Sequence, residues 1–262
     1  MELGIAGRSA VVGGASSGLG AAVAEALAAE GCRLLIWSRS EERLSQVAER
    51  IRAAHGTEVH LLAVDAAEPD APERVAHEAA RRLATIDICV LNAGGPPTSD
   101  PLATDADAWR RAFQLLAITP IGLAQALLPG MRERGWGRIV ALMSSVIREP
   151  IPTLVYSTAG RSALAGWMKT AATAAAGDGV TINGILTGRV ATARIEQLDG
   201  ERAEREGRTL DEVRRAGEAA IPAGRYGEPR ELASVVAFLC SEPASYVTGA
   251  FVPVDGGMLH AL

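Results

Sequence analysis

Residues 13–20, GGASSGLG, decide the fold of this chain. They follow a short apolar run at 8–14, which predicts a strand, and they lead into an alanine-rich helix that begins at Gly18. Gly14, Gly18 and Gly20 have the spacing G-x-x-x-G-x-G. Such glycines permit a tight turn and let a phosphate approach the backbone, and the helix N-terminus attracts an anion. Because the motif lies between a strand and a helix, it predicts a dinucleotide-binding turn.

Outward from this turn, short apolar runs alternate with longer amphipathic ones, as in parallel strands joined by crossover helices. The apolar runs are nearly continuous, which is typical of strands covered on both faces. We therefore predict an α/β fold of the Rossmann type, a doubly wound seven-stranded parallel sheet between two helix layers, as a single dinucleotide-binding domain over 1–262. The expected strands lie at 8–14, 32–38, 59–65, 87–93, 137–144, 180–186 and 249–255, and the expected helices at 18–30, 41–54, 72–84, 105–134, 154–176 and 228–240.

Two segments depart from this rhythm. The 105–134 helix contains Pro120 and Pro129, which should bend or interrupt it. Residues 189–222 are densely charged and periodic, and they predict one or two helices inserted after the sixth strand. Ligands bind at the carboxyl ends of strands in doubly wound sheets, so this insertion is expected to be a substrate lid. The alternative is a solvated helical hairpin that makes subunit contacts.

Composition excludes several classes of function. A formal net charge of −5 provides no basic field for nucleic acid. We expect no apolar run as long as the roughly 18 residues of a membrane span, and the N-terminus has no signal-peptide pattern. The three cysteines match no zinc spacing and should be reduced, and the four histidines are scattered, so no metal site is expected. These features predict a cytoplasmic protein with a small-molecule substrate and no nucleic-acid or membrane partner.

The end of the second strand indicates which dinucleotide is bound. An acidic residue there would bind the ribose 2′-hydroxyl of NAD. This chain instead has Trp37-Ser38-Arg39-Ser40. Because a guanidinium can pair with a 2′-phosphate and stack on adenine, Arg39 predicts NADP(H) as the cofactor. The alternative is a surface arginine at a helix start.

Motifs along nearly the whole chain resemble the short-chain dehydrogenase/reductase family, in particular its 3-oxoacyl carrier-protein reductases. The motifs are GGASSGLG, Asp65, Leu91-Asn92-Ala93-Gly94, GRIVALMSS at 137–145, INGILTGRVAT at 182–192, GRYGEP at 224–229 and SYVTGAFVPVDGG at 245–257. The resemblance implies the following cofactor contacts: Gly14, Ser16, Ser17, Gly18, Leu19 and Gly20 around the phosphates and adenosine ribose; Ser38 and Arg39 at the 2′-phosphate; Asp65 and Ala66 at adenine; Asn92, Ala93 and Gly94 beside the central ribose; and Gly188, Val190 and Thr192 near the nicotinamide. It also implies a homodimer or homotetramer formed through the 105–134 and 154–176 helices.

The catalytic positions depart from this family, which uses an Asn-Ser-Tyr-Lys set. By resemblance, Ser144 is the serine that orients the carbonyl. The tyrosine position holds Ser157 and the lysine position holds Arg161, while the asparagine position holds Leu116. Gly13 and Thr187 are milder departures, from threonine and proline. Residues four apart share a helix face, so Ser157 and Arg161 form the pair in place of tyrosine and lysine.

Tyr156 is the remaining candidate for the proton donor. It lies ~100° around the helix from Ser157, and a shift of the preceding loop could bring its hydroxyl to the site. A serine hydroxyl is a much weaker acid than a phenol, and an arginine cannot relay protons, although Arg161 can still hold ribose hydroxyls or an anion.

Three functions are compatible with this set. The first is an NADP(H)-dependent carbonyl reductase or alcohol dehydrogenase in which Tyr156 or water supplies the proton. The second is a non-redox reaction on the same scaffold, a cyclisation, dehydration or isomerisation, with Arg161 and Ser144 stabilising an oxyanion. The third is a catalytically silent binding subunit. The intact cofactor motifs favour the first two.

Overall fold

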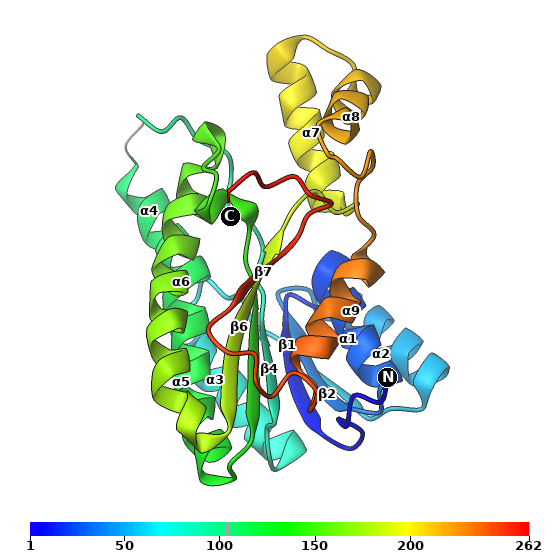
Figure 1. The fold of residues 1–262 in the computed structure, drawn as a ribbon, viewed down its shortest axis with the longest axis vertical. Coiled ribbons are helices and arrows are strands. Elements are labelled where there is room, and N and C mark those ends of the chain that lie inside the picture. The colour runs from blue at the N-terminus through cyan, green and yellow to red at the C-terminus, as the bar shows by residue number, and fades with distance from the viewer. Residues whose placement is uncertain (103–104, 262) are drawn as a thin grey trace.

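A computed structural model describes residues 1–102 and 105–261, so three positions of the expected 1–262 domain, 103, 104 and 262, lie outside the described residues. Its centre is one parallel sheet with the strand order β3-β2-β1-β4-β5-β6-β7 (Figure 1). The predicted seven-stranded, doubly wound sheet is confirmed. Its strands are β1 (Ser9–Gly13), β2 (Arg33–Ser38), β3 (Val59–Ala63), β4 (Ile88–Leu91), β5 (Gly137–Leu142), β6 (Val180–Thr187) and β7 (Phe251–Val254).

Helices cover both faces of this sheet (Figure 1). One layer contains α1 (Gly18–Ala29), α2 (Glu41–His55) and α9 (Pro229–Leu239). The other contains α3 (Ala71–Leu83), α5 (Thr119–Glu133) and α6 (Val155–Ala175).

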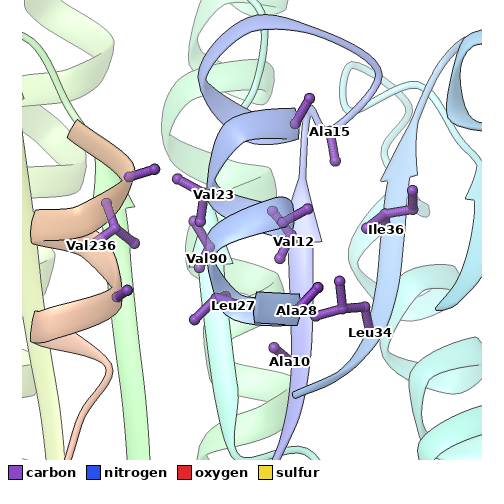
Figure 2. Packing of buried hydrophobic residues seen from close by; sticks show 14 of the residues in the cluster. Ala10, Val12, Ala15, Val23, Leu27, Ala28, Leu34, Ile36, Val90 and Val236 are labelled. Carbon is purple, nitrogen blue, oxygen red and sulfur yellow. The ribbon is translucent and has the colours of Figure 1, made fainter. Parts of the chain in front are cut away.

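Successive strand residues alternate between the two helix layers. In β1, Val12 packs in the core beneath α1 and α9, while Val11 packs in the core beneath α3, α5 and α6. Figure 2 shows the first of these cores, where Val23 and Leu27 of α1 lie between the strands and Val236 of α9. Because both faces are buried, every residue of β1 is buried. This explains why the strands have continuous apolar sequences.

The α-helix expected over 105–134 is interrupted by a π-helical stretch just before Pro120, whereas Pro129 does not end the helix that contains it. The segment consists of α4 (Ala106–Phe113), a π-helical stretch η1 (Gln114–Ile118) and α5. Pro120 lies in the first turn of α5, which continues directly from η1, and Pro129 lies inside α5.

The expectation that no apolar run reaches the length of a membrane span was wrong for this segment. Ala106–Glu133 is helical over 28 residues with a mean hydropathy of 1.5 in its most apolar window. The core helix of a soluble protein meets the same two criteria, so one such segment is weak evidence for a membrane span.

The charged stretch after β6 forms two helices, α7 (Ala193–Glu206) and α8 (Leu210–Ala219), which project beyond the end of the sheet (Figure 1). A buried polar cluster attaches them to the loop before α9. Asp199 of α7 accepts hydrogen bonds from Arg189 at 2.5 Å and from the Tyr226 hydroxyl at 2.8 Å. Asp199 is only 2% exposed, so its ion pair with Arg189 is buried and anchors α7 to the segment that follows β6.

Candidate functional site

The glycine turn joins β1 to α1 at the carboxyl edge of the sheet. Gly14 and Gly18 have φ values of 58° and 55°, in the left-handed region that disfavours a side chain. A Cβ on Gly20 would lie 2.3 Å from the carbonyl oxygen of Gly14, so α1 can approach the turn only with a glycine there. Ser17 precedes α1 without capping it through its side chain. The first N–H groups of α1 are therefore available to an anion.

Two cavities meet at this turn. The serine cavity, defined by Ser144, Ser157 and Arg161, has a volume of about 270 Å³. The arginine cavity, defined by Arg39, Arg43 and Arg111, has a volume of about 510 Å³. Both are lined by the turn and by the loop after β4. The lining residues they share are Gly14, Ser17, Asn92, Ala93, Gly94, Gly95 and Pro96.

The serine cavity brings together three of the four predicted catalytic residues. Ser144 follows β5, and Ser157 and Arg161 lie one turn apart on α6. The Nε of Arg161 donates to the Ser157 hydroxyl at 3.3 Å, and its Nη1 donates to the carbonyl oxygen of Leu142. Burial, and secondarily the positive charge of Arg194, lower the pKa of Arg161 to about 10. Arg161 is therefore still a cation at neutral pH, and it holds the oxygen of Ser157 so that the hydroxyl proton can point elsewhere.

The structure does not bring Tyr156 to this cavity. Its ring packs edge-on against Trp109 of α4, with centroids 4.6 Å apart and an interplanar angle of 76°. It is 4% exposed, and among the described residues none accepts a hydrogen bond from its hydroxyl. Leu116, at the asparagine position, lies in η1 and packs against Gly160 of α6. An apolar side chain thus replaces the amide of the family set.

The arginine cavity contains the residues expected at the adenosine end. Arg39 is largely exposed, with Nη1 4.0 Å from a carboxylate oxygen of Asp65. Asp65 accepts a hydrogen bond from the backbone N–H of Ala67 at 3.0 Å, and Ala66 also lines the cavity. The Trp37 Nε1 and the Ser38 hydroxyl are buried without a protein partner among the described residues. Both residues also line the arginine cavity.

The other predicted cofactor residues are divided between the cavities. Asn92 donates through Nδ2 to the Gly13 carbonyl at 3.1 Å and so ties the loop after β4 to the glycine turn. Thr192 caps α7, and its hydroxyl accepts from the backbone N–H of Ile195 at 3.4 Å. Gly20 packs against the backbone of Gly14 in the turn and, within the described chain, lines neither cavity. The remaining residues line one cavity or both: Ser16 the arginine cavity, Leu19, Gly188 and Val190 the serine cavity, and Ala93 and Gly94 both.

Sequence reasoning missed three cations that face these cavities. Arg43 lies in the first turn of α2, soon after Arg39, and its nearness along the chain could have revealed it. Arg111 reaches the arginine cavity from α4, and Arg194 reaches the serine cavity from α7. No local pattern indicates these two, because they lie far along the chain from the glycine turn.

Comparisons with known proteins agree with this geometry. Residues 14–259 match a family model described as enoyl-(acyl carrier protein) reductase. The chain is 31% identical to 3-oxoacyl-[acyl-carrier-protein] reductase FabG of Aquifex aeolicus, over 98% of this chain and all of that protein. Its structure is similar to that of L-sorbose reductase from Gluconobacter frateurii complexed with NADPH and L-sorbose, with a TM-score of 0.94, 32% identity and complete coverage of both chains. The actinorhodin polyketide ketoreductase with NADPH has a TM-score of 0.93 and 27% identity, covering 97% of this chain and 98% of that one.

Proposed function

The chain belongs to the short-chain dehydrogenase/reductase family, and we propose that it is an NADP(H)-dependent oxidoreductase acting on a carbonyl or alcohol substrate. One observation carries the proposal: a cavity lined by Arg39, Arg43 and Arg111 and a cavity lined by Ser144, Ser157 and the half-buried Arg161 meet at one glycine turn. The relatives complexed with NADPH support the same cofactor. They favour a redox reaction over the non-redox and the catalytically silent alternatives.

The residues present fit NADP(H). The φ values of Gly14 and Gly18 and the uncapped start of α1 suit a diphosphate. Arg39 and Arg43 would hold the 2′-phosphate, and Ser38 lines the same cavity. Asp65 and Ala66 would line the adenine site.

The bound nicotinamide would supply or accept a hydride at the substrate carbon. Ser144 and Ser157 would donate hydrogen bonds to the substrate oxygen as negative charge develops on it. Arg161 would stabilise that charge through its hydrogen bond to the Ser157 oxygen and would hold the cofactor ribose beside it. These groups are oriented before the substrate arrives, because Arg161 is also bonded to the Leu142 carbonyl.

Water would supply the proton to the reduced oxygen. Arg161 cannot relay a proton, and Tyr156 packs on Trp109 rather than lining the serine cavity. In this proposal Tyr156 anchors the start of α6, and the hydroxyls of Ser144 and Ser157 position the carbonyl. Hydride transfer would then be assisted by hydrogen bonding alone, without a phenolic acid.

The insertion at 189–222 would act as the substrate lid. Ile195 and Leu198 of α7 line the serine cavity, which supports this role over a purely solvated hairpin.

The protein would be a homodimer or homotetramer in the cytoplasm. The exposed Ile118 of η1, 54% accessible, and the exposed small residue Ala163 on α6 support a subunit contact there.

Binding of NADPH and NADH tests the cofactor assignment. Calorimetry should show tighter binding of NADPH, and Arg39→Asp should weaken it about 10- to 100-fold, because a charge-assisted pair becomes a repulsion. NADH binding should change less than about threefold. Equal losses for both dinucleotides would remove this role from Arg39.

Absorbance of the nicotinamide band, followed on mixing NADPH with a panel of ketones and aldehydes, tests the reaction. The band should decay with at least one carbonyl compound. Substrate conversion with no decay would favour the non-redox alternative, and no conversion at all would favour the silent one.

A further inference from the structure

The serine cavity carries one positive charge, that of Arg194, to which the proposed hydride transfer assigns no role. Two guanidinium groups, Arg161 and Arg194, line it, and none of its lining residues within the described chain is acidic. Neither guanidinium has a carboxylate oxygen within 4.0 Å among the described residues. Their charges interact, since Arg194 contributes to the lowered pKa of Arg161. Two mutually repelling cations in one cavity suit an anionic ligand.

Arg194 is held in place at the wall of this cavity by hydrogen bonds to two neighbours. From α7 its Nη2 donates to the carbonyl oxygen of Pro96, in the loop after β4, at 2.7 Å, and its Nη1 donates to Gln197 at 3.2 Å. A Cβ on Gly95 would lie 3.1 Å from both Nε and Nη2, so the guanidinium rests on the bare backbone of a glycine. Its Nε–H has no acceptor among the described residues. The group is therefore ordered and still able to donate.

We propose that Arg194 binds a carboxylate on the substrate, so that the enzyme reduces oxo acids rather than neutral ketones. This inference rests on the proposed function and narrows it to a substrate class. Arg194 enters the serine cavity from the lid, on the same helix as Ile195 and Leu198, whereas the phosphate-binding turn enters it from between β1 and α1. An acidic substrate would also link α7 to the loop after β4 through Arg194 and thereby favour a closed lid. L-sorbose, bound in the similar reductase, carries no charge, so the proposal gives this chain a substrate class different from the ligand of that relative.

Matched acids and esters provide the test. The substrates are pyruvate, acetoacetate and levulinate, each beside its methyl ester, with NADPH in excess. The wild type should show a higher kcat/KM for at least one acid than for its ester. Arg194→Met should lower kcat/KM for that acid about 10- to 100-fold, the effect of losing a hydrogen bond between charged groups, and change the ester less than about threefold. Arg205→Met, an exposed arginine of the same helix, is the control and should change neither.

Calorimetry gives a second readout that does not depend on turnover. Butyrate should bind the wild-type protein with NADPH more tightly than butyramide does, and Arg194→Met should abolish the difference. Equal binding of acid and amide, or equal turnover of every acid and ester by the wild type, overturns the proposal.

A loss of NADPH affinity in Arg194→Met with the acid-to-ester ratio unchanged also overturns it, and assigns Arg194 to the cofactor diphosphate. If the wild type neither binds NADPH nor reduces any carbonyl, the proposed function fails. The comparison of butyrate with butyramide on the protein alone still decides the anion site.

Discussion

Two neighbouring residues on α6, Tyr156 and Ser157, offer the sharpest test of the catalytic cavity. The tyrosine is the conventional acid by residue type, and the serine occupies the cavity. We expect Tyr156→Phe to leave turnover nearly unchanged and Ser157→Ala to impair it strongly. The two substitutions remove one hydroxyl each from adjacent positions, so each is the control for the other.

The magnitudes follow from what each hydroxyl contacts. Tyr156→Phe keeps the ring, and with it the edge-on contact with Trp109 at 4.6 Å. Since its hydroxyl has no acceptor among the described residues, the cost should be about 0.5 kcal/mol or less, roughly a twofold change in rate. Ser157→Ala removes a donor to the developing alkoxide, and loss of one such donor costs about 3 kcal/mol, or about 100-fold in kcat. It also leaves the Nε of Arg161 without its acceptor.

The assay is NADPH oxidation with the best carbonyl compound from the panel, at saturating NADPH. NADPH affinity and the melting temperature are measured for both variants. Both should stay near the wild-type values, because neither change alters the glycine turn or the sheet. A lowered kcat then reports on catalysis rather than on folding or cofactor loss.

A different pattern would refute the reasoning. If Tyr156→Phe lost about 100-fold in kcat at unchanged NADPH affinity while Ser157→Ala kept its rate, the phenol would be the acid. The loop before α6 would then have to rearrange when substrate binds. If neither variant lost activity, the hydroxyl of Ser157 would have no catalytic role.

Two further predictions concern protonation and the lid. The pKa of Arg161 is lowered to about 10, so its positive charge is lost as the pH rises through that value. We therefore expect kcat/KM to be flat from about pH 6 to 9 and to fall above about pH 10. An inflection near neutrality would instead indicate a phenolic or imidazole acid. Asp199→Asn leaves the guanidinium of Arg189 without its negatively charged partner. The free energy that holds α7 against the rest of the domain should fall by up to about 3 kcal/mol. The substitution should raise KM more than it lowers kcat and speed hydrogen exchange over 193–219, whereas Glu206→Gln on the exposed face should do neither.

The elements were predictable where a local signal was strong. The glycine turn, the seven strands and the break in the 105–134 segment follow from spacing, apolar runs and Pro120, each readable within a few residues. The π-helical form of that break was not predictable, because it depends on how η1 packs against α6. The need for a glycine at position 13 also depends on packing between elements. A Cβ there would lie 2.5 Å from the Asn92 carbonyl oxygen and 3.0 Å from the Trp37 ring. Only the folded chain brings those groups together.

The sequence by itself predicted the architecture, which the structure confirms, and it predicted a dinucleotide site at the glycine turn, because strands and glycine turns leave signals within short stretches of the chain. By resemblance to the family's motifs it predicted Ser144, Ser157 and Arg161 as catalytic candidates, and the structure places all three on the serine cavity. The tertiary structure decided what Tyr156 faces and brought Arg194 to the serine cavity. The direction of a helical side chain depends on where its helix begins and on what packs beside it, and Arg194 reaches the serine cavity from a helix inserted after β6. These relations arise between elements, so no window along the chain contains them.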